Sequence, residues 1–191
     1  MKKKLVALAV LVLVAAVGAP AQKKKKGPSK GAQYEYEKAV ISMNYGLEDE
    51  ALKYLNQAVA MDAKHAESFK LMGLLQFRKK NYAECAVAYE KYLALNPADS
   101  ETQANLGYCY EYLDRPDRAE AEYLKAIGSD GNANACFGLS KLFLKQQKFA
   151  EAQGYAEQAI AKKADWPAAL NLLGVIQNQT KQYPEAAATF G

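Results

Sequence analysis

A period of 34 residues runs through the sequence from about residue 32 to residue 191, and it constrains the fold more than any other feature. Three series of residues in matching contexts are spaced by 34, 34, 33 and 34 residues. The series are Ala39, Gly73, Gly107, Ser140 and Gly174; Ala51, Cys85, Ala119, Ala152 and Ala186; and Leu55, Tyr89, Tyr123, Ala156 and Phe190. Self-similarity at such a period is typical of stacked supersecondary units, which bury their hydrophobic faces against one another.

The hydrophobic residues within each unit have helical spacing. Phe69, Met72 and Gly73 fall on one face of a first helix, and Cys85 and Tyr89 on one face of a second. A small residue on each helix allows the two backbones to approach closely. The sequence therefore predicts an all-α solenoid of about five helix-turn-helix units. Their expected bounds are residues 32–65, 66–99, 100–132, 133–166 and an incomplete 167–191.

This pattern resembles the tetratricopeptide repeat (TPR) family, and the second unit carries the resemblance most completely. Its matching residues are Phe69, Met72, Gly73, Tyr82, Cys85, Tyr89 and Pro97. The first unit departs most, because Glu35, Lys38 and Ser42 stand where the family is mostly apolar, which suits a terminal unit with one face in solvent. The resemblance implies a right-handed superhelix that binds a protein or peptide partner and is not an enzyme.

The first helix of each unit carries a further stripe, largely apolar, offset from the face that packs on its own second helix. In the TPR superhelix this stripe resembles the lining of the concave groove, where extended peptides or helices dock. The predicted groove residues are Tyr36, Met43, Lys70, Leu74, Phe77, Tyr108, Tyr112, Phe137, Lys141 and Leu144. The alternative, that the stripe is buried between units, remains open for Val40, Leu74 and Val175.

Lysines and aromatic residues alternate in this predicted groove. Lys70, Lys141 and Lys145 beside aromatic side chains favour a partner segment that is partly acidic and partly apolar. Lys70 and Asn105 also resemble fragments of the clamp with which some TPR domains grip a C-terminal carboxylate. Leu74 stands where that clamp has an asparagine, so we do not expect binding of chaperone tails.

The N-terminus is laid out as a secretory signal peptide. A basic start is followed by an apolar run, Leu5–Val17, and by small residues at Ala19 and Ala21. We expect residues 1–21 to be a signal peptide cleaved after Ala21, or an N-terminal anchor if the positive run Lys23–Lys26 prevents cleavage. Residues 22–31 are then a basic flexible linker, either a spacer or a peripheral contact with the membrane or cell wall. The expected location is the periplasm or cell envelope.

The basic residues are concentrated at this N-terminus. Eight of the 25 lysines and arginines precede residue 31, and the remaining 17 face 21 acidic residues, which leaves the body with a net charge of −4. Nucleic-acid binding requires clustered basic residues on the folded surface. We therefore expect no nucleic-acid partner.

No residue pattern in the sequence suggests catalysis. There is no glycine-rich phosphate loop, no nucleophile elbow and no metal-ligand spacing, so we expect neither a cofactor nor a metal. The single histidine, His65, is expected on the surface of a turn. Cys85, Cys109 and Cys136 are expected to be small buried residues, and Cys109–Cys136 is the pair to test for a disulfide.

The sequence thus predicts a non-enzymatic interaction scaffold of the cell envelope. Two alternatives stay open. One is a structural array that self-associates through the uncapped C-terminal repeat, and the other is an accessory subunit of an envelope enzyme.

Overall fold

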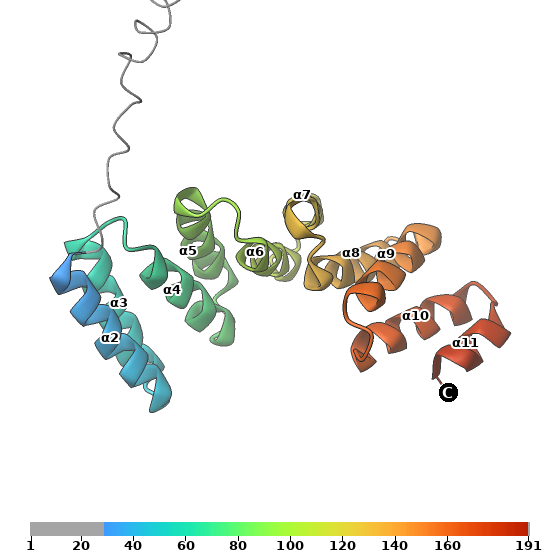
Figure 1. Cartoon of the computed structure of the whole chain (residues 1–191), viewed down its shortest axis with the longest axis horizontal. Helices are drawn as coiled ribbons and strands as arrows, with labels where there is room; N and C mark the ends of the chain where they lie inside the picture. Colours follow the sequence, from blue (N-terminus) through green and yellow to red (C-terminus); the bar gives the residue numbers. More distant parts are fainter. Residues whose placement is uncertain (1–28, 191) are drawn as a thin grey trace, which may run out of the picture.

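The computed structural model describes residues 29–190, in which ten α-helices form five consecutive pairs (Figure 1). The helices are α2 (Lys30–Asn44), α3 (Glu48–Met61), α4 (Ala66–Arg78), α5 (Tyr82–Leu95), α6 (Ser100–Tyr112), α7 (Pro116–Asp130), α8 (Ala133–Lys145), α9 (Phe149–Lys162), α10 (Pro167–Gln179) and α11 (Tyr183–Phe190). The all-α architecture and the five pairs expected from the sequence are confirmed. The predicted signal peptide, residues 1–21, and the Lys23–Lys26 run lie outside the described residues.

The pairs stack into an arc. Helix α8 contacts α6 and α10, its counterparts in the neighbouring pairs, whereas the second helices of neighbouring pairs do not meet to the same extent. The stack therefore curves with α4, α6, α8 and α10 on its inner side and α5, α7 and α9 on its outer side (Figure 1). None of the helices between residues 29 and 190 has the length and hydropathy of a membrane span.

Small residues hold the two helices of a pair close together. A Cβ atom added at Gly73 would collide with the ring of Tyr89, and one added at Gly107 would collide with the ring of Tyr123. In the fourth pair the corresponding residue is Ser140, whose buried hydroxyl donates a hydrogen bond to the Ala152 carbonyl at 2.7 Å. These periodic small residues are thus points of close approach between the two helices, and a tyrosine fills the space beside Gly73 and beside Gly107.

A side chain caps the start of the first helix in each of the first four pairs, α2, α4, α6 and α8. Ser29, His65, Asp99 and Asn132 accept hydrogen bonds from the backbone N–H three residues later, which satisfies a donor left unpaired by the helix. The expectation that His65 lies on the surface is wrong, because its side chain is only 1% exposed. Its Nδ1 accepts from Ser68, and its Nε2 lies 3.3 Å from Gln33 Oε1 on α2. His65 therefore joins the first two pairs.

The cysteines pair differently from the expectation. Cys85 on α5 and Cys109 on α6 form a disulfide, and Cys136 is a buried free thiol. All three are buried, as the sequence predicted, but the suggested Cys109–Cys136 bridge is wrong. Cys136 packs with Ala159 and Ala169, toward the C-terminal end of the array, whereas Cys109 lies in the same cluster as Cys85. The disulfide links the second helix pair to the third.

Candidate functional site

A pocket of about 290 Å³ opens between α2, α4 and α6, the first helices of the first three pairs. Its lining includes Tyr36 from α2, Lys70 and Leu74 from α4, and Glu101 and Asn105 from α6. Three of the predicted groove residues, from two separate repeats, therefore converge on one site, which we call the inner pocket. Leu74 remains 43% exposed, so the alternative that it is buried between units does not apply to it.

The cation of the inner pocket is already paired. Lys70 Nζ lies 2.9 Å from Asp99 Oδ2 and 3.9 Å from Glu101 Oε2, and the Tyr92 hydroxyl donates to the same Asp99 oxygen at 2.6 Å. Burial alone would raise the pKa of Asp99, but the hydrogen bonds from Tyr92, Lys70 and the Thr102 N–H outweigh it and lower that pKa to about 2. Burial and the bond to Asp99 raise the pKa of Tyr92 to about 12. Lys70 is thus fixed by a charged network.

Two more predicted residues form an aromatic cluster further along α4 and α6. The Phe77 ring lies edge-on to Tyr112, with the ring centroids 5.7 Å apart. Both rings contact Tyr82, which stacks on Tyr112 at 4.5 Å with the two planes 8° apart. Tyr112 remains 56% exposed. The cluster therefore presents an aromatic surface at the C-terminal ends of α4 and α6.

A third group joins α6 to α8. Lys141 Nζ forms a salt bridge with Glu111 at 3.1 Å and lies 5.8 Å from the ring centroid of Tyr108 and 6.0 Å from that of Phe137. The Tyr108 hydroxyl donates to the Asn134 carbonyl at 2.9 Å, so this half-buried ring also ties the two helices together. Lys70 and Lys141 both have carboxylate partners within the fold, so two of the three lysines expected to attract an acidic ligand are already neutralised. The third, Lys145, is exposed and forms no salt bridge within residues 29–190.

The last two predicted residues contribute mainly to the fold. Met43 is half-buried and packs against the buried cluster that contains Ala39 and Leu55. Leu144 is half-buried against the main hydrophobic core. The sequence did not point to Asp99, although it occupies the same capping position as His65 and Asn132 in the neighbouring repeats. The N-cap residues recur with the repeat period, and this regularity could have predicted that the Asp99 carboxylate lies beside Lys70.

These side chains are suited to binding. Among residues 29–190, no group of three or more His, Cys, Asp or Glu side chains could hold a metal ion. The inner side instead offers aliphatic and aromatic surface with fixed, internally paired charges. Surfaces of this kind bind protein segments through a few desolvated anchor residues.

Comparison with known families identifies the repeats. A tetratricopeptide repeat model matches residues 49–100 and 137–190, and a second tetratricopeptide repeat model matches residues 88–121. The chain therefore belongs to the tetratricopeptide repeat family, whose members are non-enzymatic scaffolds that bind proteins and peptides. A comparison with curated proteins finds no match.

Several solved structures share the fold at low sequence identity. MamA (41-end) from Desulfovibrio magneticus RS-1 has a TM-score of 0.76 at 16% identity, covering 85% of this chain and 93% of that one. PilW, described as a widely conserved type IV pilus biogenesis factor, has a TM-score of 0.71 at 19% identity over 84% and 75% of the two chains. YrrB, described as a TPR protein with an unusual peptide-binding site, has 0.68 at 18% over 83% and 82%.

Proposed function

We propose that this protein is an exported scaffold of the cell envelope that binds a segment of a partner protein along its inner side. The inner pocket carries the proposal, because it joins exposed Leu74 to Tyr36 and Asn105 across three repeats. The family supports a protein or peptide as the ligand. A preformed pocket of this kind favours binding, since little conformational entropy is lost on the scaffold side.

The arrangement of charged side chains narrows the chemistry expected of the ligand. The ammonium groups of Lys70 and Lys141 are held by Asp99 and Glu111, so binding depends chiefly on apolar contact with Leu74 and the exposed face of Tyr112. The paired lysines and carboxylates then act as oriented hydrogen-bonding groups at the edges of the contact. We expect a segment with two or more large apolar side chains, spaced to reach both the inner pocket and the aromatic cluster.

The groove is tested by crosslinking the protein in its native envelope and identifying the captured partner. Leu74→Glu should weaken capture roughly thirtyfold, because an apolar anchor contributes about 2 kcal/mol. Leu124→Glu is the matched control: Leu124 is 44% exposed on outer-side helix α7, and its substitution should leave capture unchanged. Equal loss in both variants, or capture of the protein's own copies alone, would contradict the groove assignment.

Two observations support export. The sequence begins with a basic start, the apolar run Leu5–Val17 and the small residues Ala19 and Ala21. The Cys85–Cys109 disulfide is a bond that persists mainly in oxidising compartments. Cell fractionation with mass spectrometry of the N-terminus tests this directly. A soluble envelope protein beginning at Gln22 would establish cleavage, a membrane-bound protein retaining residues 1–21 would establish an anchor, and a cytosolic protein would refute export.

A further inference from the structure

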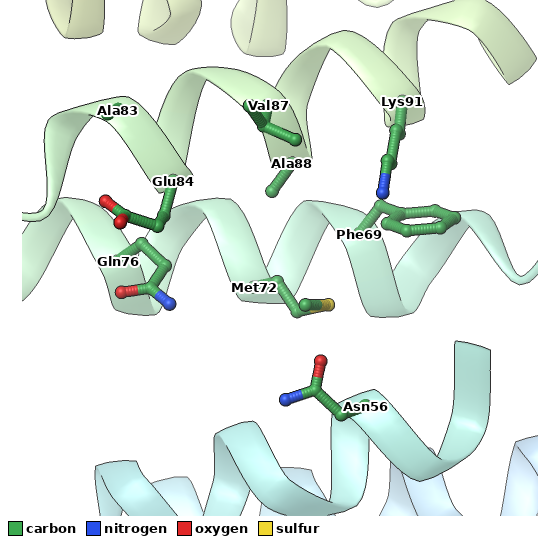
Figure 2. Close-up of a pocket in the computed structure, with 9 residues that line it drawn as sticks. All are labelled: Asn56, Phe69, Met72, Gln76, Ala83, Glu84, Val87, Ala88 and Lys91. Atoms are coloured by element: carbon green, nitrogen blue, oxygen red, sulfur yellow. The ribbon is translucent and has the colours of Figure 1, made fainter. Parts of the chain in front are cut away.

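A second hollow lies on the outer side of the array, where α4 runs between α5 and α3 (Figure 2). Its volume is about 380 Å³. Met72 lies near its middle, Phe69 toward one end and Gln76 at the other, and Val87 projects from α5 along its edge. Val87 is 50% exposed. We call this site the outer hollow; it shares no lining residue with the inner pocket.

The outer hollow results from two side chains specific to the first junction between repeats. The residues 34 positions after Asn56 and Gln76 are Glu90 and Tyr110. At that second junction Tyr110 is buried, and its hydroxyl donates a hydrogen bond to Glu90, so the pair spans the corresponding space. At the first junction Gln76 instead accepts a hydrogen bond from Asn81 at 2.9 Å. The space above Met72 therefore stays open.

The two ends of the outer hollow carry opposite charges. Glu84 and Lys91 lie two turns apart on α5, about 10 Å along the helix axis, and Figure 2 places them at opposite ends. Lys91 Nζ lies 5.4 Å from the Phe69 ring centroid. Within residues 29–190, neither Glu84 nor Lys91 forms an ion pair with another side chain. The site thus combines an apolar floor with one negative and one positive end.

We propose that the outer hollow is a second docking site, which binds an amphipathic α-helix of a partner protein. The helix lies along the channel between α3 and α5, in the manner of a helix packed into the groove of two others. Two apolar side chains one turn apart enter above Met72. A basic residue meets Glu84, and an acidic residue about seven positions away meets Lys91, since these charges are two turns apart. The site does not depend on the inner groove, so both faces can be occupied together.

The probe is a hydrocarbon-stapled helical peptide with Lys and Glu seven residues apart, two leucines between them and the staple on the opposite face. It is titrated into the full chain while the methyl NMR signals of Met72 and Val87 are recorded. We expect saturable shifts of both signals, with a dissociation constant below about 1 mM. Shifts of neither signal would overturn the proposal.

A filling variant separates docking from non-specific contact. Asn56→Glu with Gln76→Tyr transfers the pair of the second junction to the first, so it should close the hollow without loss of melting temperature and weaken the peptide at least tenfold. Val87→Lys, which places in the second repeat the residue that Lys53 supplies in the first, should weaken it similarly. Leu124→Glu, at the position of Asn56 two repeats further on, should have no effect. If the filling variant and Val87→Lys both bind the peptide as tightly as the unaltered protein does, the proposal is overturned.

Charge reversal tests the assigned chemistry. Glu84→Lys should weaken the Lys/Glu peptide about threefold and strengthen a peptide with two glutamates by a similar factor, as expected for exposed ion pairs. Identical responses of the two peptides would overturn the assignment of the charged ends. A concentration-dependent doubling of mass that the filling variant removes would show that a second copy occupies the hollow, and would overturn the assignment to a different partner.

Discussion

Asp99 links the fold to the inner pocket at the scale of a single residue. Its side chain accepts the Thr102 N–H at the start of α6, and it also receives the hydroxyl of Tyr92 and the ammonium group of Lys70. The same carboxylate therefore caps a helix and fixes the one lysine of the pocket. Because all three bonds favour the charged form, the folded state holds the pKa near 2 against burial.

Asp99→Asn should lower the free energy of unfolding by roughly 2 kcal/mol at neutral pH, because asparagine keeps the cap but loses the charge. The folded pKa is depressed, so this contribution is complete above pH 3.8 and is lost as the pH falls toward about 2. Urea unfolding of both proteins between pH 7 and pH 2 should show their difference shrinking within that window. Glu101→Gln, whose side chain is 70% exposed, is the control and should change little. A difference that stays constant down to pH 2 would contradict this account.

His65 shows where sequence reasoning stops at the residue scale. A histidine between Lys64 and Glu67 has the composition of a surface turn, yet its ring is buried against Tyr36 with the centroids 5.3 Å apart. Its position repeats at Asp99 and Asn132, which also cap helices. The three residue types differ, so the role was recognisable only from the period and not from the residue itself.

At the scale of helices, each pair turns through one residue in the left-handed region. These residues are Gly46, Lys80, Asp114, Gln147 and Lys181, with φ between 55° and 74°. Their spacing follows the repeat period, but only the first is a glycine. The sequence could therefore predict the helices from their small packing residues, whereas the conformation of the turns is imposed by the packing of the two helices on each other.

Lys80→Gly and Gln147→Gly should each raise the free energy of unfolding by about 0.5–1 kcal/mol. A side chain in the left-handed region costs roughly 1–2 kcal/mol, and the greater freedom of glycine in the unfolded chain offsets part of that gain. Asp114→Gly should gain less, because aspartate tolerates this conformation. Lys79→Gly is the neighbouring control: its φ is −76°, so glycine there should destabilise the protein. Thermal and urea unfolding measure all four, and equal effects at Lys79 and Lys80 would refute the argument.

At the scale of the whole molecule, the period of 34 residues was sufficient to predict the array, because each repeat contacts its neighbours in the same way. It could not predict the features that differ between junctions. The outer hollow is present because the first junction has Asn56 and Gln76 at the positions where the second junction has the hydrogen-bonded pair Glu90 and Tyr110. The disulfide forms because Cys109 packs in the same cluster as Cys85 and not with Cys136. Both features are determined by the particular side chains that meet across one boundary between repeats. A pattern that all the repeats share carries no information about those differences.

The Cys85–Cys109 disulfide is the only covalent cross-link between side chains of the described residues, and it joins the second pair to the third. Its reduction should lower the free energy of unfolding by about 3 kcal/mol, because the bridge restricts the unfolded chain. A variant with both Cys85→Ala and Cys109→Ala should be insensitive to reductant, whereas Cys136→Ala should keep the full response.

Thiol labelling of the denatured protein provides an independent count. Protein isolated from the envelope without reductant should react at Cys136 alone, and reduced protein should react at all three cysteines. If all three react without reductant, the bridge does not form in the cell, and the support that it gives to export is lost. If only one thiol reacts, the second and third repeats are covalently cross-linked in the cell. Separating them then requires breaking the disulfide as well as the apolar interface between the two repeats. Leu74 and Asn105, on α4 and α6, belong to these two repeats, so the bridge also keeps the two walls of the inner pocket in register.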